Sequence, residues 1–210
     1  MKSGWCKIKI FCVYLSIFLL GSCAAPSYWP EVQGRVLDET SNQPIENVIV
    51  VAKWGGYRNH AFIKSRSECY HVETTTTDNN GHFAFGNRID GVSMLHDRTV
   101  DYVIYKSGYV TSDKTYEKVN YKNNIKFLKT FVGSRKERLD YLFRLNTLCH
   151  GTGENKKNLI LIQKNIVDEI KDYVKTNEEI KKLRIMRWSI ERLEYGIEEA
   201  DRRFYQGKGD

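Results

Sequence analysis

Several features that would point to a common class of function are missing from this 210-residue sequence. It has no internal repeat, no low-complexity tract and no stripe of basic residues interleaved with aromatics that would indicate nucleic-acid binding. No nucleophile-elbow context surrounds its serines, and no His-x-x-Glu pair with a distant histidine suggests catalytic zinc. We therefore expect a protein that is not an enzyme and that uses no cofactor.

Long apolar runs are also scarce, and the one that stands out lies near the N-terminus. Residues 8–20 are apolar and follow Lys2 and Lys7, with Lys9 inside the run and no acidic residue nearby. The run is too short, and too closely followed by polar sequence, for a transmembrane helix. This arrangement is typical of a signal peptide, which we place at residues 1–22.

The last residues of this leader and the cysteine after it resemble a known processing signal. Leu20-Gly21-Ser22-Cys23 resembles the lipobox of bacterial lipoproteins. The resemblance implies that Cys23 becomes the first mature residue, with a diacylglyceryl thioether and an acylated (palmitate-type) amine. The alternative is an ordinary signal peptide cleaved near Ala24 and Ala25.

Lipidation would determine where the protein resides. Ala24, not aspartate, follows Cys23, and in a Gram-negative cell the lipoprotein sorting rule then implies the outer membrane, on its periplasmic or surface face. Two or more acyl chains anchor a protein stably without a spanning helix, so we expect residues 23–30 to be a tether. Loss of the three leader lysines lowers the formal net charge from +7 to +4, so the basic balance partly reflects the leader.

Cysteine is infrequent, and its placement is informative. Of the five cysteines, Cys6 and Cys12 leave with the leader and Cys23 is the lipidation site. Cys69 and Cys149 remain in an oxidising compartment, where we predict a disulfide that closes a loop of 80 residues. Two unpaired buried thiols are the alternative. A zinc site built from Cys69, His71 and Glu73 with another histidine is a further alternative, but we expect no metal because a disulfide removes the thiolate.

Alternating apolar and polar residues predict antiparallel strands over most of the first half of the mature chain. We expect strands at residues 32–38, 45–54, 69–77, 82–86, 100–105 and 125–131. A loop of about a dozen residues is expected from 55 to 66, and residues 87–98 and 111–124 should be irregular. In the segment 69–77, strand periodicity places Cys69, His71 and Glu73 on one face.

Three spaced elements in this region resemble the carboxypeptidase regulatory-like domain. They are Val32-x-Gly34-x-Val36-x-Asp38, Pro44-Ile45-x-x-Val48-x-Val50-x-Ala52 and Thr77-Asp78-x-x-Gly81-x-Phe83, with a later Tyr105-Lys-Ser-Gly-Tyr109. The resemblance implies a transthyretin-like β-sandwich of about seven antiparallel strands, covering residues 31–132. It does not imply a function, because this sandwich occurs as an accessory module on many proteins.

The remainder of the chain has helical periodicity, so we expect an α+β protein with a helical region at residues 133–206 that packs on the sandwich. Capping boxes begin at Ser134 and Thr176, each with a glutamate three residues later. Apolar spacing predicts helices at residues 134–148, at 159–174 and, as one helix of about seven turns, at 180–204. The last helix should pack antiparallel on the second, although oligomerisation through it is an alternative.

Together these features favour a non-enzymatic envelope lipoprotein whose sandwich binds or scaffolds an unidentified partner. The alternative function is a glycan- or peptide-binding module that uses the aromatic loop of residues 54–69. Aromatic side chains supply contact area with a polar tip, and the candidate ligand-binding residues are Trp54, Tyr57 and Tyr70. Possible partners are the membrane, through Cys23, and an envelope protein or glycan, but not nucleic acid.

Overall fold

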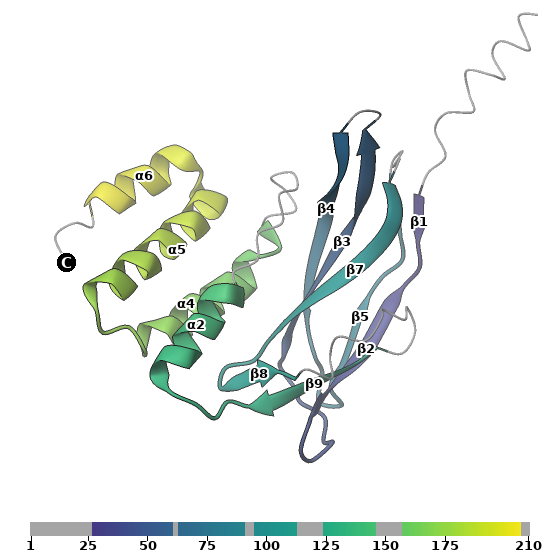
Figure 1. Ribbon diagram of the computed structural model, residues 1–210, viewed down its shortest axis with the longest axis horizontal. Helices are drawn as coiled ribbons and strands as arrows, with labels where there is room; N and C mark the ends of the chain where they lie inside the picture. Colours follow the sequence, from purple (N-terminus) through teal and green to yellow (C-terminus); the bar gives the residue numbers. More distant parts are fainter. Residues whose placement is uncertain (1–26, 61–62, 91–94, 113–123, 146–156, 207–210) are drawn as a thin grey trace, which may run out of the picture.

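The computed structural model describes residues 27–60, 63–90, 95–112, 124–145 and 157–206, which form a mixed α+β structure of three sheets and four helices (Figure 1). The strands are β1 (Ser27–Trp29), β2 (Val32–Asp38), β3 (Ile49–His60), β4 (Ile63–Thr76), β5 (His82–Phe85), β6 (Arg88–Asp90), β7 (Leu95–Tyr105), β8 (Tyr109–Thr111) and β9 (Asn124–Thr130). The helices are α2 (Arg135–Leu145), α4 (Ile160–Lys171), α5 (Asn177–Tyr195) and α6 (Ile197–Gln206).

Two of the sheets make up most of the β structure. One has the order β5-β2-β9-β8 and the other the order β4-β3-β7, while β1 and β6 form a separate pair. All pairs are antiparallel except β2 with β9, which run parallel. The expectation of antiparallel pairing throughout was therefore wrong for β9, which lies between β2 and β8 and runs parallel to β2 and antiparallel to β8.

Strand β3 has an apolar cluster on each face. Val50, Ala52 and Trp54 point to one side and join side chains of β2, β5, β7 and β9 in what we call the intersheet cluster. Ile49 and Val51 point to the other side, where they join Val72, Tyr105 and side chains of α2, α4 and α5 in the sheet–helix cluster. The β4-β3-β7 sheet therefore has the other large sheet on one face and the helices on the other.

Gly34 shows why the β2 motif needs a glycine. A Cβ at this position would lie 2.3 Å from the carbonyl oxygen of Asn124 and 2.6 Å from the ring of Phe83. The close approach of β9 on one side and the aromatic ring on the other leaves no room for a side chain. In β5, Phe83 and Phe85 are buried while His82 and Ala84 are exposed.

The turn between β4 and β5 has the expected hairpin geometry. One carboxylate oxygen of Asp78 accepts hydrogen bonds from the backbone N–H groups of Asn80 and His82, at 2.9 and 2.8 Å. Gly81 has φ of +71°, which a glycine adopts at little cost. This oxygen of Asp78 is thus used by the backbone of the turn.

Three expectations about the β region need correction. Residues 55–66 do not form a long loop, because β3 continues to His60 and β4 begins at Ile63, so the two strands make a long hairpin. Residues 87–98, expected to be irregular, contain β6 and the start of β7. The tether also ends earlier than expected, because β1 pairs with β6 and Trp29 is buried.

The helix starts agree with the sequence, but the last helix does not continue as predicted. Both capping boxes are present, with Ser134 bonded to Glu137 and Thr176 to Glu179. At Gly196, with φ of +89°, the helix breaks into α5 and α6. The hydrophobic stripe is continuous in the sequence, yet Ile197 beyond the break is 57% exposed.

Helices α2, α4 and α5 contribute side chains to the sheet–helix cluster, and α6 packs on α5. Asn158, just before α4, donates a hydrogen bond of 2.6 Å to the carbonyl oxygen of Val72 in β4. An ion pair between Lys164, near the start of α4, and Glu194, near the end of α5, shows that these two helices run antiparallel, as expected. None of the described helices combines the length and apolar character needed to cross a bilayer.

Candidate functional site

The structure removes Trp54 from the candidate ligand surface. Trp54 is 1% exposed and belongs to the intersheet cluster, where its ring meets Phe85 edge-on at 5.6 Å. We expected it where a strand ends and the aromatic loop begins, but β3 continues to His60, and its alternation turns Trp54 inward. The backbones of Tyr57 and Tyr70 lie in β3 and β4, and their side chains lie outside what the structure describes.

Cys69 lies on a different face from the one that periodicity predicted. Trp54 pairs with His71 and Gly55 pairs with Cys69, so the register skips Tyr70 and β4 has a bulge there. Because of this extra residue, Cys69 lies on the face of the sheet that the helices cover, where it packs against the sheet–helix cluster. His71 lies on the opposite face, beside Trp54. Cys149, its predicted partner, and Cys23, the predicted lipidation site, lie outside the described residues.

His71 and Glu73, which were weighed as metal ligands, form an ion-pair cluster with Arg88. Glu73 lies 2.7 Å from Nε2 of His71 and 3.2 Å from a guanidinium nitrogen of Arg88. The hydrogen bond from His71, together with the charge of Arg88, lowers the pKa of Glu73. Among the described residues, no three histidine, cysteine, aspartate or glutamate side chains gather where they could hold a metal ion.

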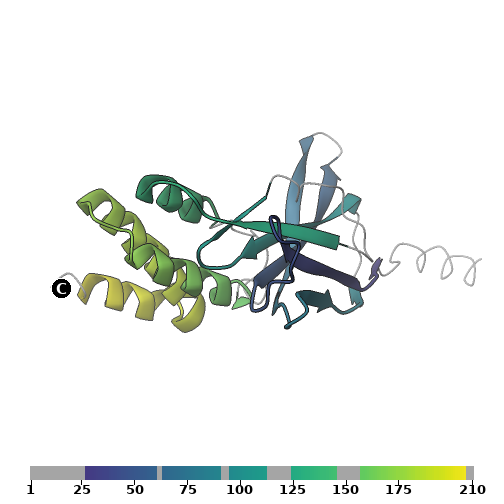
Figure 2. The same ribbon diagram turned by 90° about the horizontal axis from the view of Figure 1, so that it is seen from below.

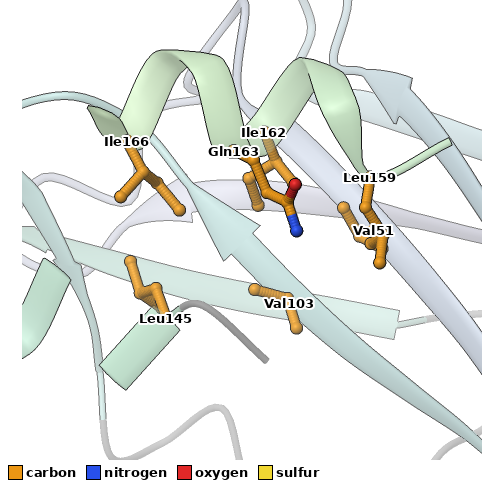
Figure 3. A pocket seen from close by; sticks show the side chains of 7 residues that line it. All are labelled: Val51, Val103, Leu145, Leu159, Ile162, Gln163 and Ile166. Atoms are coloured by element: carbon orange, nitrogen blue, oxygen red, sulfur yellow. The ribbon is translucent and has the colours of Figure 1, made fainter. Parts of the chain in front are cut away.

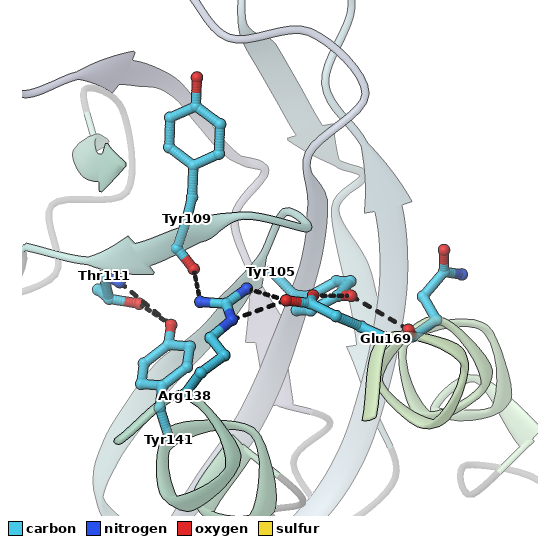
Figure 4. Close-up of polar contacts among 7 residues, drawn as sticks. Tyr105, Tyr109, Thr111, Arg138, Tyr141 and Glu169 are labelled. Carbon is cyan, nitrogen blue, oxygen red and sulfur yellow. Dashed lines mark hydrogen bonds and ion pairs between the residues drawn. The ribbon is translucent and has the colours of Figure 1, made fainter. Parts of the chain in front are cut away.

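The most buried polar group on the described chain is Arg138 of α2, whose side chain is fully enclosed (Figure 4). Its Nε donates to Glu169 of α4 at 2.7 Å, and another guanidinium nitrogen donates to the carbonyl oxygen of Tyr109 at 2.6 Å. The second carboxylate oxygen of Glu169 accepts a hydrogen bond of 2.6 Å from the hydroxyl of Tyr105. Burial, reinforced by the carboxylate of Glu169, raises the pKa of Tyr105.

This network joins α2, α4 and the C-terminal end of β7, and its chemistry is structural. Each charged group faces an opposite charge or a hydrogen-bond partner, and the rings of Phe131 and Tyr141 lie against the guanidinium at 5.2 and 5.4 Å. Within the described part of the chain no opening leads to it from solvent, since both Arg138 and Glu169 are buried. The sequence offered one sign of it, namely that Arg138 lies one turn before Leu142 on the apolar stripe of its helix.

The described residues enclose one small cavity between the sheet and the helices. A cavity of about 10 Å³ lies between Val51 and Val103 of the sheet and Leu159, Ile162 and Ile166 of the α4 segment (Figure 3). A cavity of this size holds at most one water molecule. It is therefore a packing defect and not a substrate site.

A larger hollow lies on the surface of the helical region, between α5 and α6. This groove has a volume of about 270 Å³. Its apolar part includes Leu183 and Trp188 of α5 and Phe204 of α6. Its charged part consists of the three guanidinium groups of Arg184, Arg187 and Arg203, with Glu191 as the one carboxylate.

The two helices that form the groove are held together at Trp188. The indole N–H of Trp188 donates to Asp201 of α6 at 2.8 Å, and its ring lies 6.0 Å from that of Phe204. Arg203 is bound to Glu199 at 2.7 Å on its own helix. Across the residues that the structure describes, Arg184 and Arg187 have neither a carboxylate partner nor a hydrogen bond. Sequence reasoning missed this site because it treated α5 and α6 as one straight helix.

Comparison with known proteins identifies no family. No protein-family model matches the chain, and no curated protein matches it. Among solved structures, a 9R-lipoxygenase from Cyanothece PCC8801 is similar at 10% identity over 78% of this chain, with a TM-score of 0.28. This chain spans 30% of the length of that lipoxygenase chain. A likeness of that size carries no argument about activity, so function has to be inferred from the residues of this chain.

Proposed function

We propose that this protein is a lipid-anchored component of the bacterial outer membrane that acts by binding or scaffolding and not by catalysis. The observation that carries the proposal is Leu20-Gly21-Ser22-Cys23 at the end of an apolar, lysine-flanked leader. Acyl chains on Cys23 would hold the protein stably at the membrane, since each buried CH₂ contributes about 0.8 kcal/mol.

The arrangement of the chain supports this proposal. Strand β1 begins at Ser27, four residues after Cys23, so the β region would lie close to the anchor. Helices α5 and α6 lie at the opposite end of the molecule from β1 (Figures 1 and 2). A lipid on Cys23 would therefore leave the α5–α6 groove facing away from the membrane that holds the protein, where a partner can reach it.

The β region is proposed to be a sandwich of the carboxypeptidase regulatory-like kind. The intersheet cluster supports this assignment, because it contains buried side chains from both large sheets, including Val36 of β2 and Ile104 of β7. Gly34, Gly81 and Phe83 of the resembling motifs occupy positions that their geometry requires. In this proposal the sandwich is the support and the helical region is the part that meets a partner.

We propose that the protein is not a catalyst because the polar clusters of the described residues have their charges paired. The charges around Arg138 and around Glu73 are paired with one another, and the first of these clusters is sealed from solvent. Neither presents a nucleophile beside a base to a cavity that could hold a substrate. The glycan-binding alternative loses its main support, because Trp54 is buried.

The test is expression of the full chain in a Gram-negative host, followed by membrane fractionation and intact-mass measurement. We expect the protein in the outer-membrane fraction, with a mass that corresponds to cleavage before Cys23 and to triacylation. The Cys23→Ser variant is the control and should leave that fraction. An unmodified Cys23, or a mature N-terminus near Ala25, would refute the anchor.

A further inference from the structure

We infer that the groove between α5 and α6 is a docking site for an acidic peptide segment of a partner protein, one that carries apolar side chains among its carboxylates. The inference rests on the proposed function, in which the protein binds a partner, and it names the class of that partner.

Charge complementarity is the first argument. Three guanidinium groups line the groove against one carboxylate. Arg203 is already engaged by Glu199, but Arg184 and Arg187 are one turn apart on α5 and have no partner among the described residues. A planar guanidinium binds a carboxylate through two parallel hydrogen bonds, so the two arginines can receive two carboxylates spaced along one segment.

The apolar part of the groove gives the second argument. Leu183, Trp188 and Phe204 form part of its lining, beside Ile180, which is 42% exposed. Helix α6 packs on Trp188 of α5 and ends at Gln206. The apolar side chains of α5 continue beyond that point, towards Ile180. An apolar side chain placed there would extend the contact that α6 makes with α5.

The size of the groove favours side chains of a larger partner over a complete small ligand. Its 270 Å³ lies below the roughly 300–1,000 Å³ of sites that enclose drug-sized molecules. The lining residues run from Ile180 to Glu191, which at 1.5 Å per residue is about 17 Å along the helix. That length suits about five residues of an extended peptide or three turns of a helix, which is the groove mode of peptide recognition.

The lining of the groove argues against a glycan as the ligand, and the position of the groove argues against a lipid surface. A glycan presents many hydroxyl groups that need acceptors, and Glu191 is the one carboxylate in the lining. A lipid surface is disfavoured by position, because the groove lies at the end of the molecule opposite β1 and the proposed anchor (Figures 1 and 2).

The experiment measures binding of labelled 12-residue peptides to the full lipidated chain in detergent micelles by fluorescence anisotropy. The probe alternates glutamate pairs with leucine and phenylalanine. One control peptide replaces every glutamate by glutamine, and a second replaces every apolar residue by serine. We expect the acidic–apolar peptide to bind at least tenfold more tightly than either control, with an affinity that falls as salt rises.

The variant R184E/R187E should lower the affinity at least tenfold, because it turns both receiving charges against the peptide. R184Q/R187Q removes the charges with less risk to folding and should give a smaller loss in the same direction. The matched control K129E/K136E makes the same change in net charge at exposed lysines of β9 and α2, outside the groove, and should bind as the parent does.

Equal binding by R184E/R187E and the parent, or by the glutamine peptide and the acidic one, would overturn the inference. So would preferential binding of phosphatidylglycerol vesicles, or a dimer of the full chain that R184E/R187E dissociates, since these assign the groove to a membrane or to a second copy. The unlipidated Cys23→Ser chain should still bind the peptide. A failure of anchoring is thereby separated from a failure of docking.

Discussion

Arg138 is the fully buried charged side chain at the contact between the sheet and the helices. Its guanidinium is fully buried and is balanced by Glu169 at 2.5–2.7 Å. Arg138→Met would leave the buried carboxylate without its counter-charge, and we expect a loss of about 3–5 kcal/mol in the free energy of unfolding, measured by urea denaturation. Arg144→Met, at an exposed position of the same helix, should change it by less than about 0.5 kcal/mol.

A second variant separates the charge from the packing. In R138M/E169L both members of the pair are replaced by apolar side chains, so no unpaired charge remains, and much of the stability lost in R138M should return. If the double variant is as unstable as R138M, the hydrogen bonds from Arg138 to Tyr109 and from Tyr105 to Glu169 matter more than the ion pair itself.

Glu179 gives a prediction about pH. The guanidinium of Arg135, with the backbone N–H groups of Lys175 and Thr176, lowers the pKa of Glu179 from its ordinary 4.5 to about 2. The carboxylate therefore stabilises the start of α5 fully above pH 4.5, and this contribution is lost as the pH falls towards 2. The parent should be more stable than Glu179→Gln at pH 6, and the difference should shrink between pH 4.5 and 2 in thermal melts. A difference that is constant over that range would contradict the capping role.

The capping boxes were predictable from the sequence, whereas the burial of Arg138 and the face on which Cys69 lies were not. A capping box is a local pattern of two side chains and their own backbone, so Ser134 and Glu137 specify it without help from the rest of the chain. The burial of Arg138 depends on a glutamate 31 residues away, and the face of Cys69 depends on a bulge that Tyr70 introduces. The position of Arg138 one turn before Leu142 on the apolar stripe is a sign of its burial but does not name its partner, and the bulge at Tyr70 has no local sequence signal.

The break between α5 and α6 sets how two whole helices lie against each other. Gly196 has φ of +89° and ψ of 172°, a conformation that costs other residues of order 1–3 kcal/mol. In Gly196→Ala we expect α5 to continue as the sequence pattern suggests, which would separate Trp188 from Asp201 and expose the indole. Tryptophan fluorescence should then shift to longer wavelength, and the groove should be lost.

Gly86→Ala is the matched control for this change. No described atom lies within 4 Å of the place that a Cβ on Gly86 would occupy, and its φ is not positive, so the substitution should leave fluorescence and stability close to the parent. A red shift that is equal in both variants would mean that the signal does not report the α5–α6 contact.

Periodicity located the elements but not their limits. Strand alternation correctly predicted β2 and β5, because one face of each strand packs on the intersheet cluster. It missed the extension of β3 and β4, because the pairing of Gly55 and Gly56 depends on the facing strand and not on their own propensity. The parallel pairing of β9 with β2 is likewise set by how the chain crosses between them, which periodicity does not encode.

At the scale of the molecule, the helices and sheets combine into one layered arrangement. The β4-β3-β7 sheet contributes side chains to both apolar clusters, one on each of its faces. Leu142 of α2 and Ile166 of α4 belong to the same apolar cluster as Val51 of β3, so these helices and this sheet share one core.

The predicted disulfide between Cys69 and Cys149 would tie these layers covalently. Cys69 packs on the sheet–helix cluster, and so does Leu145, which ends α2 four residues before Cys149. A loop of 80 residues closed by the bond corresponds to an upper value of about 4.5 kcal/mol in loop-closure entropy. We expect Cys69→Ala to lower the free energy of unfolding by up to that amount, and reduction of the parent to have the same effect. Alkylation of both thiols in the non-reduced, folded protein, followed by mass measurement, would show the bond to be absent. Reduction should in that case leave the stability of the parent unchanged, and Cys69→Ala should cost only the small cavity left in the cluster.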